Sequence, residues 1–355
     1  MRRLGRWSTS ARRRAAVGAR ALLVGLALVS AAPASAQRWA IDDPDQGPVA
    51  LAPGAAGAHQ LSGLTWATGE RYYAVSDSDG TLYEVSIALD HATGRIERAA
   101  VGAALPLPKA KDIEGVALAA TGKTVFVTDE EGPALREYRL ADGALLRSAR
   151  VPAIYLDQTR KNLSFEALTR DGANALWTGN EDALKSDGPT TSSTSGSLVR
   201  LQRFDADLRP TAQYAYPLDS VEGDMLVHEH GTGLSELVAL PDGRLLALER
   251  SLSVAGLRIR LYELDVSGAA DVAKLSSLAG ATVVPVTKRL LWERRFADDN
   301  FEGAALGPRL ADGSHSVVLI SDDGHNLAQA LYPLRLRRHS GERAAAKRTP
   351  ADPAR

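Results

Sequence analysis

Acidic side chains recur in register along the chain, and these side chains have the greatest potential for chemistry. Four glutamates occupy equivalent places in consecutive segments, namely Glu114, Glu166, Glu236 and Glu302. The first two are 52 residues apart, and the following intervals are 70 and 66 residues. In an earlier segment of the same kind, Ser62-Gly63 takes this place.

A second set of acids follows near the end of the next apolar stretch in each segment. It comprises Asp77, Asp129 to Glu131, Glu181 with Asp182, Glu249, and Asp322 with Asp323. Carboxylates that converge without partners repel one another, which raises their pKa values or recruits cations. Because hard oxygen ligands favour Ca²⁺ or Mg²⁺ over zinc or copper, a hard divalent cation is the expected cofactor.

Both sets supply the candidate site residues. The candidate metal ligands are Glu114, Asp129, Glu166, Glu181, Glu236, Glu249, Glu302 and Asp322. The candidate catalytic residues are Glu114, Glu166 and Glu302, together with the cations Lys288 and Arg250. A metal at these carboxylates would neutralise a substrate phosphate and activate a water for in-line attack, while the cations would bind phosphate oxygens.

A purely structural role for the same acids is the alternative. Asp and Glu at strand ends commonly accept hydrogen bonds from backbone amides in turns, or pair with basic neighbours. The chain offers such neighbours in Arg136, Lys161, Arg250, Lys288 and Arg289. The pattern of acids alone leaves both interpretations open.

The elements that carry these acids are short strands in a repeated unit. Each unit has an apolar strand with the first acid, then a turn, a second strand that ends in acids, and a third strand of alternating pattern. Residues 113–118, 125–131 and 135–138 form one such unit. Five units recur at intervals of about 50 residues or slightly more, which is typical of an all-β propeller of four-stranded blades. The chain has no long helical pattern, which argues against a layered α/β fold.

The pattern also predicts how the blades are completed. Fourth strands fit residues 145–151, 212–217 and 289–296, and the last unit loses its pattern after Leu336. We therefore expect a strand near Trp39–Ile41 to close the last blade, with a sixth, degenerate blade left open. Equivalent positions in a propeller are related by its axis, so the first acids should form a ring near one mouth of the channel. Whether the second acids join this ring depends on strand geometry.

The chain of 355 residues divides into three expected parts. Residues 1–36 hold seven Arg and no acid, then a short apolar run, then Ala34-Ser35-Ala36, which together predict a cleaved signal peptide. Residues 37–336 form the expected propeller domain, and residues 337–355 an expected disordered, charged tail. The leader indicates a periplasmic or secreted bacterial protein with no membrane attachment after cleavage. The sequence has no Cys, so no disulfides hold the fold.

Charge and motifs exclude several classes of function. Removing the leader leaves residues 37–355 with 35 basic and 43 acidic side chains, a net charge of −8, which disfavours nucleic-acid binding. The chain has no G-x-S-x-G elbow and no Gly-rich phosphate loop followed by Lys. The triplet His228-Glu229-His230 is not the H-E-x-x-H of a zinc protease.

Several segments resemble the phytase-like family, often described as having esterase-like activity of phytase. The segments are KDIEGVA at 111–117, NLSFEAL at 162–168, PVTKRLL at 285–291, NFEGAALGPRLADG at 300–313 and ISDDG at 320–324. They occur in the family's order and the resemblance covers roughly residues 58 to 336. The family pattern often has Asn where Gly324 stands.

The resemblance implies a secreted propeller that is a Ca²⁺-dependent hydrolase of phosphoric esters. Its expected partners are a small phosphoester substrate and a divalent cation, and we expect a monomer. Two alternatives remain. One is a non-catalytic periplasmic binding or scaffold propeller whose acids are structural, since propellers host many functions. The other is a metal-dependent lactonase-type propeller, which needs a similar set of acids.

Overall fold

The computed structural model describes residues 38–54, 57–222, 232–254, 256–324 and 329–339. The expected signal peptide, the triplet at 228–230 and residues 340–355 of the expected tail lie outside this part. Within it, no helix is both long enough and apolar enough to span a membrane. The one α-helix of these described ranges, α1 (Ala153–Gln158), is a short connection. The described residues are otherwise strands and loops, which confirms the all-β prediction.

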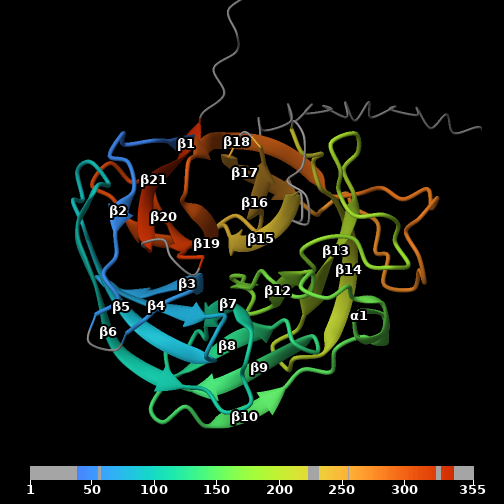
Figure 1. Cartoon of the computed structure of the whole chain (residues 1–355), viewed down its shortest axis with the longest axis horizontal. Coiled ribbons are helices and arrows are strands. Elements are labelled where there is room, and N and C mark those ends of the chain that lie inside the picture. The colour runs from blue at the N-terminus through green and yellow to red at the C-terminus, as the bar shows by residue number, and fades with distance from the viewer. Residues whose placement is uncertain (1–37, 55–56, 223–231, 255, 325–328, 340–355) are drawn as a thin grey trace, which may run out of the picture. The chain divides into compact units, whose positions relative to one another are not determined.

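Five four-stranded antiparallel sheets form the blades of a propeller (Figure 1). Blade 1 has β3 (Leu61–Thr68), β4 (Arg71–Ser76), β5 (Thr81–Leu89) and β6 (Ile96–Pro106). Blade 2 has β7 (Ile113–Leu118), β8 (Thr124–Asp129), β9 (Ala134–Arg139) and β10 (Leu145–Ser148). Blade 3 has β11 (Thr169–Arg170), β12 (Leu176–Gly179), β13 (Leu198–Phe204) and β14 (Pro210–Pro217). Blade 4 has β15 (Thr232–Ala239), β16 (Leu245–Ser253), β17 (Gly256–Asp265) and β18 (Thr287–Phe296).

Blade 5 is closed by the N-terminal strand, as the sequence predicts. Its own strands are β19 (Asn300–Arg309), β20 (His315–Asp322) and β21 (Ala330–His339). The fourth strand is β1 (Arg38–Asp42), which pairs along the C-terminal half of β21, while β2 (Val49–Ala50) pairs with its start. β21 thus includes three residues that we assigned to the tail, because their backbone groups pair with β1. The described residues form five blades and contain no sixth.

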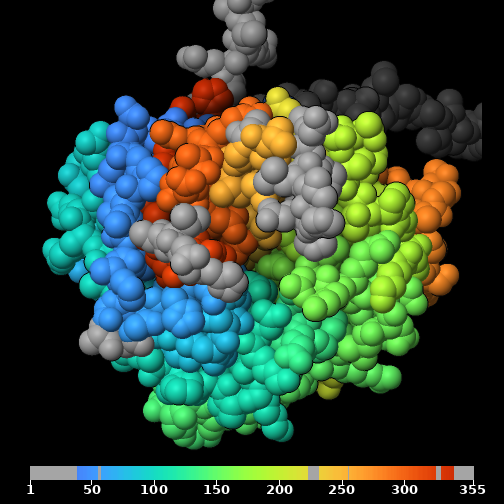
Figure 2. Space-filling view, viewed as in Figure 1, coloured from blue at the N-terminus to red at the C-terminus, as the bar shows by residue number. Residues whose placement is uncertain are grey.

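The hydrophobic core is divided among the interfaces between neighbouring blades. The blades lie side by side around the centre (Figure 2). β16 shows how a strand serves two interfaces at once. Leu246 and Leu248 join the core with Phe301 of blade 5. Leu245 and Ala247 join the core with blade 3 instead. Because side chains alternate between the two faces of a strand, each blade buries both faces against its neighbours.

Glycines let the innermost strands approach one another around the axis. A Cβ on Gly303 of β19 would lie 2.0 Å from the backbone oxygen of Ser62 in β3. A Cβ on Gly63 would lie 2.3 Å from the backbone oxygen of Glu114 in β7. No real Cβ tolerates such distances, so these glycines directly after the recurrent Glu or Ser position keep the ring closed.

Blade 3 departs from the repeat at its innermost strand. The repeat predicts a first strand that carries Glu166, but the pairing there is one isolated bridge, Phe165 to Asn180, followed by the two-residue β11. The Leu168 N–H donates to the carboxylate of Glu236, 3.0 Å away, instead of to a strand partner. A side chain of blade 4 therefore replaces part of the strand ladder.

Candidate functional site

The starts of the first strands and the ends of the second strands, which carry the two sets of acids, lie at the same mouth of the propeller axis. In each regular blade the second strand runs antiparallel to the first, so the end of the second strand lies beside the start of the first. Ile113 pairs with Asp129 in blade 2, and Asn300 pairs with Asp322 in blade 5. This register resolves the question that the sequence left open.

Local irregularities in the innermost strands coincide with the recurrent acids. The register of β7 with β8 shifts between Ile113 and Val116, a stretch that contains Glu114. The register of β19 with β20 shifts between Phe301 and Gly303, which flank Glu302. Such bulges redirect a side chain at the rim of a sheet, and they are common beside functional sites.

Eight carboxyl groups make up this site, which we call the acidic mouth. They are Asp77, Asp112, Glu114, Glu130, Glu166, Glu181, Glu302 and Asp322. Within it, Asp112, Glu114 and Glu130 place carboxylate oxygens within 4.8 Å of one another. Glu130, Glu166 and Glu181 do the same, so that Glu130 belongs to both triads. Four of these five residues are buried and Asp112 is half-buried.

Arg250 is the basic residue that pairs with the acidic mouth. Its Nη2 lies 2.8 Å from Glu181 Oε1 and its Nε lies 3.0 Å from Glu302 Oε1. Among the described residues, no other Lys, Arg or His forms an ion pair with the eight carboxyl groups. One cation therefore faces eight acids, five of which are buried and three half-buried.

Burial and mutual repulsion raise the pKa values of these carboxyls. Burial, reinforced by Asp322 and Glu302, raises the pKa of Asp77 to about 8. Burial is also the main cause that raises the pKa of Glu130 to about 7, with Glu181 and Asp112 adding to it. The pKa of Glu302 rises to about 7 through burial, although Arg250 opposes the rise. Burial and the Glu114 charge place the pKa of Glu166 well above its ordinary value.

The acidic mouth is compatible with a hard divalent cation. All its candidate ligands are oxygens, as Ca²⁺ and Mg²⁺ prefer. Two further side-chain oxygens, Asp77 Oδ1 and Asn300 Oδ1, are shielded from solvent and have no hydrogen-bond partner among the described residues. A buried acceptor without a donor costs free energy, and a cation would satisfy it.

The structure brings together most of the predicted site residues but not all of them. Six of them lie in the acidic mouth: Glu114, Glu166, Glu181, Glu302, Asp322 and Arg250. Four do not: Asp129, Glu236, Glu249 and Lys288. The contacts that the structure gives these four residues lie outside the mouth, and they differ among the four.

Asp129 forms an ion pair with Arg136. The carboxylate of Glu236 accepts hydrogen bonds from the backbone N–H groups of Leu168, at 3.0 Å, and Leu237, at 2.9 Å. These two acids therefore have the structural roles that formed the alternative interpretation. They hold strands and blades in register.

Glu249 and Lys288 form a separate buried cluster at the interface of blades 3 and 4. Lys288 donates to Glu249 and, at 2.7 Å, to Asp219. Its Nζ also lies 4.0 Å from the ring centre of Tyr262, and Tyr216 donates to Glu249 at 2.5 Å. Because successive side chains of a strand point to opposite faces, Glu249 faces this cluster while the next residue, Arg250, faces the acidic mouth.

Three members of the mouth were not among our candidate ligands. Asp77 and Glu130 belong to the second set of acids but were not selected from it, and Asp112 was in neither set. Asp112 stands two residues before Glu114, the spacing that puts two side chains on one face of a strand. Glu130 directly follows Asp129, so choosing between them requires knowing where β8 ends. The first signal is readable from the sequence, and the second is not.

A family model matches most of the chain. The sequence profile of the Phytase-like family, described as Esterase-like activity of phytase, matches residues 57–325. No curated protein matches the chain.

Several solved structures are similar at low identity. Hydrazine synthase of Kuenenia stuttgartiensis is 10% identical over 75% of this chain and 57% of its own, with a TM-score of 0.37. Glutaminyl cyclase of Myxococcus xanthus is 12% identical over 85% of this chain and 95% of its own, with a TM-score of 0.39. The calcium-binding protein regucalcin of Agrobacterium tumefaciens is 13% identical over 84% of this chain and 94% of its own, with a TM-score of 0.40. This chain spans little more than half of the hydrazine synthase chain, and likeness at these TM-scores carries no argument about activity.

Proposed function

This chain belongs to the Phytase-like family, and on that premise we propose that it is a Ca²⁺-assisted hydrolase of phosphoric esters. The observation that carries the proposal is the pair of carboxylate triads that share Glu130 at one mouth of the propeller. The excess of acids over Arg250 in a buried site supports a cation there, since a buried site of like charges is stabilised by opposite charge. The phosphate group of a substrate would require the same counter-charge.

Five residues would hold cations in this proposal. Asp112, Glu114 and Glu130 form one set of ligands, and Glu130, Glu166 and Glu181 form the other. A bound divalent cation would supply Lewis-acid polarisation of the phosphoryl oxygens and neutralise their charge.

The remaining groups of the acidic mouth would act on substrate and proton. Arg250 holds Glu181 and Glu302 in place, and its guanidinium adds positive charge where a phosphate must enter among carboxylates. Asp77, whose Oδ1 is buried without a partner, is the carboxyl that we assign to hold a proton and pass it between the attacking water and the leaving oxygen. The expected signal peptide would place this activity in the periplasm or the medium, with a small phosphoester as substrate.

Hydrolysis assays on the purified protein test the proposal. The substrates are p-nitrophenyl phosphate, its bis ester and phytate, each after chelation and again after Ca²⁺ is restored. We expect turnover that requires Ca²⁺ and is lost in a Glu166→Ala, Glu302→Ala double variant. Glu131→Gln is the matched control, because Glu131 is exposed and pairs with Lys111 outside the mouth.

Three outcomes contradict the proposal in different ways. No turnover above that of the double variant, with no effect of Ca²⁺ on stability, would favour a scaffold whose acids are structural. A Ca²⁺-dependent rise in melting temperature without turnover would favour a non-catalytic cation-binding propeller. Turnover of lactones but not of phosphoesters would favour the lactonase alternative.

A further inference from the structure

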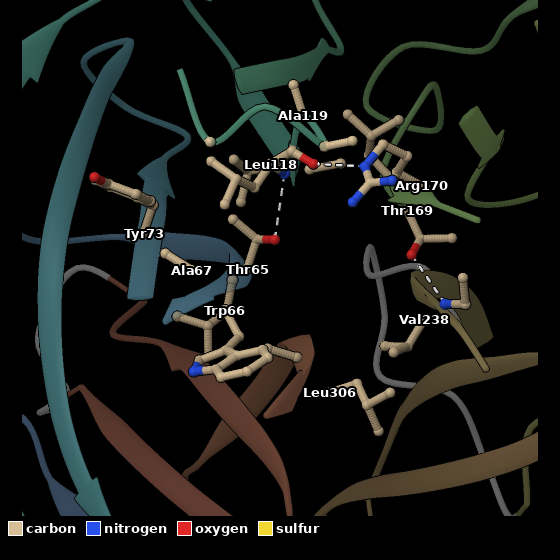
Figure 3. A pocket seen from close by; sticks show the side chains of 18 of the residues that line it. Thr65, Trp66, Ala67, Tyr73, Leu118, Ala119, Thr169, Arg170, Val238 and Leu306 are labelled. Carbon is tan, nitrogen blue, oxygen red and sulfur yellow. Dashed lines mark hydrogen bonds between the residues drawn. The ribbon is translucent and has the colours of Figure 1, made fainter. Parts of the chain in front are cut away.

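A cavity of about 520 Å³ lies at the other end of the innermost strands (Figure 3). The recurrent acids stand near the starts of these strands, whereas most residues that line the cavity come from later in β3, β7, β11, β15 and β19. Others come from the start of β4 and from the loop at 119–122. The cavity and the acidic mouth share no residue. Its volume falls in the range of about 300–1,000 Å³ that is usual for pockets that bind small molecules.

Polar groups and apolar side chains both line the cavity, and its apolar part includes aromatic rings. Trp66, Leu118, Val238 and Leu306 line it, together with several alanines and the ring of Tyr73. In Figure 3, Trp66 and Leu306 lie on one side and Arg170 on the other. Trp66, Leu118 and Leu306 are only partly buried, so each keeps apolar surface that a ligand could cover.

The charged groups of the cavity are all of one sign. Arg71 and Arg170 line it, and among its described lining residues there is no Asp or Glu. Arg71 pairs with Glu84, which lies outside the lining, at 3.6 Å, whereas no ion pair among the described residues involves Arg170. This contrasts with the opposite mouth and with the net charge of −8 of residues 37–355. Charge complementarity therefore favours an anionic ligand.

The hydrogen-bonding groups that face the cavity are mainly donors. Arg170 donates from Nε to the Leu118 carbonyl at 2.7 Å and from Nη1 to Asn174 Oδ1 at 2.8 Å, and no hydrogen bond among the described residues uses its Nη2 (Figure 3). The hydroxyl oxygens of Thr65 and Thr169 accept from backbone N–H groups, at 3.4 and 2.9 Å. Their own protons have no acceptor among the described residues, so both hydroxyls can donate to a ligand.

We propose that this cavity is a second binding site, for a small organic molecule with an apolar, ring-bearing body and one anionic group. The body packs on Trp66 and Leu306, and the anion pairs with Arg170 and the two threonine hydroxyls. Because the site shares no residue with the acidic mouth, it stands whether or not the chain hydrolyses phosphoesters.

A fluorescence titration with 8-anilino-1-naphthalenesulfonate tests this site, because the probe joins an aromatic body to one sulfonate. N-phenyl-1-naphthylamine, which lacks the sulfonate, is the neutral counterpart. We expect one saturable sulfonate site per chain in the folded, chelator-treated protein, accompanied by quenching of Trp66. Arg170→Met should weaken sulfonate binding by about tenfold or more and leave the neutral probe within about threefold.

Three further variants keep the test decisive. Ala67→Phe, which fills the cavity, should remove both probes, and Glu166→Gln at the acidic mouth should change neither. If Arg170→Met loses both probes because the pocket has collapsed, Arg170→Lys decides, since it retains the charge and should retain the preference for the sulfonate. Equal binding of the two probes by the native chain, equal sulfonate affinity in Arg170→Met, or undiminished binding in Ala67→Phe would overturn the proposal.

Discussion

Replacing Glu130 with glutamine should stabilise the cation-free protein at pH 8. Glu130 is the carboxyl common to both triads, and its side chain is 9% exposed. Its Oε1 accepts from the Ser164 N–H at 2.7 Å, a bond that glutamine can keep. The substitution therefore removes charge and little else.

The magnitude follows from the pKa of Glu130, which burial and the neighbouring acids raise from 4.5 to about 7 in the folded chain. At about 1.4 kcal/mol for each tenfold change in proton affinity, this amounts to about 3 kcal/mol. Between pH 4.5 and pH 7 the folded state holds a proton that the unfolded state has lost, so the free energy of unfolding falls as the pH rises. The glutamine variant escapes this fall.

Urea unfolding in the presence of a chelator, followed by tryptophan fluorescence, measures the effect. We expect the variant to be more stable than the native chain by about 3 kcal/mol at pH 8, with a difference that shrinks toward zero at pH 4.5. Excess Ca²⁺ should reverse the order at pH 8, because it stabilises the native chain and the variant lacks the shared ligand. Glu131→Gln should change stability by less than about 0.5 kcal/mol under all these conditions.

Two results would refute this reasoning. If the difference in free energy of unfolding between the variant and the native chain is no larger at pH 8 than at pH 4.5, Glu130 is not held in a repulsive buried site. Equal stabilisation of both proteins by Ca²⁺ would mean that the cation binds elsewhere.

Three other substitutions test the fold and the assignment of residues. Gly303→Ala should lower the free energy of unfolding by about 2 kcal/mol or more, because the added Cβ would lie 2.0 Å from a backbone oxygen of blade 1. Gly172→Ala, where a Cβ meets nothing within 4 Å, should cost far less, and equal urea midpoints for the two variants would contradict this expectation. Trp39→Ala should lower the free energy of unfolding by about 3–5 kcal/mol in the same assay, because Trp39 is 3% exposed in the strand that closes blade 5. A decrease below about 1 kcal/mol would mean that this closure contributes little to stability. Lys288→Met should lower the free energy of unfolding by about 3 kcal/mol, because it leaves Glu249 charged and buried without its partner. The folded variant should keep Ca²⁺-dependent hydrolysis. Loss of hydrolysis in a variant of unchanged stability would mean that Lys288 belongs to the active site.

The fold was largely predictable because each blade repeats a local pattern. The second strands, the fourth strands and the closure by residues near Trp39 all follow from alternation and turn signals. The start of blade 3 was not predictable, because the Glu236 side chain satisfies the Leu168 N–H there in place of a strand. No local pattern encodes a contact between residues 68 positions apart.

The site was predictable only as a set of acids, not residue by residue. Period-2 alternation determines which of two adjacent residues faces the axis, and bulges near Glu114 and Glu302 shift that alternation by one. Glu130 stands one residue past the end of β8 at Asp129, so its place in the mouth depends on where that strand ends. Lys288 belongs to a family-like segment, but β18 pairs at the outside of blade 4, far along the sheet from the innermost strand.

A crystal structure of the protein grown with Ca²⁺, with anomalous scattering measured at long wavelength, would show whether the acidic mouth binds a cation. We predict an anomalous peak in the acidic mouth, with oxygens of Glu130 and of at least one further triad member at about 2.3–2.6 Å from it. A mouth without such a peak at millimolar Ca²⁺, with its carboxyls still clustered around Arg250, would contradict the claim that these acids form a cation site.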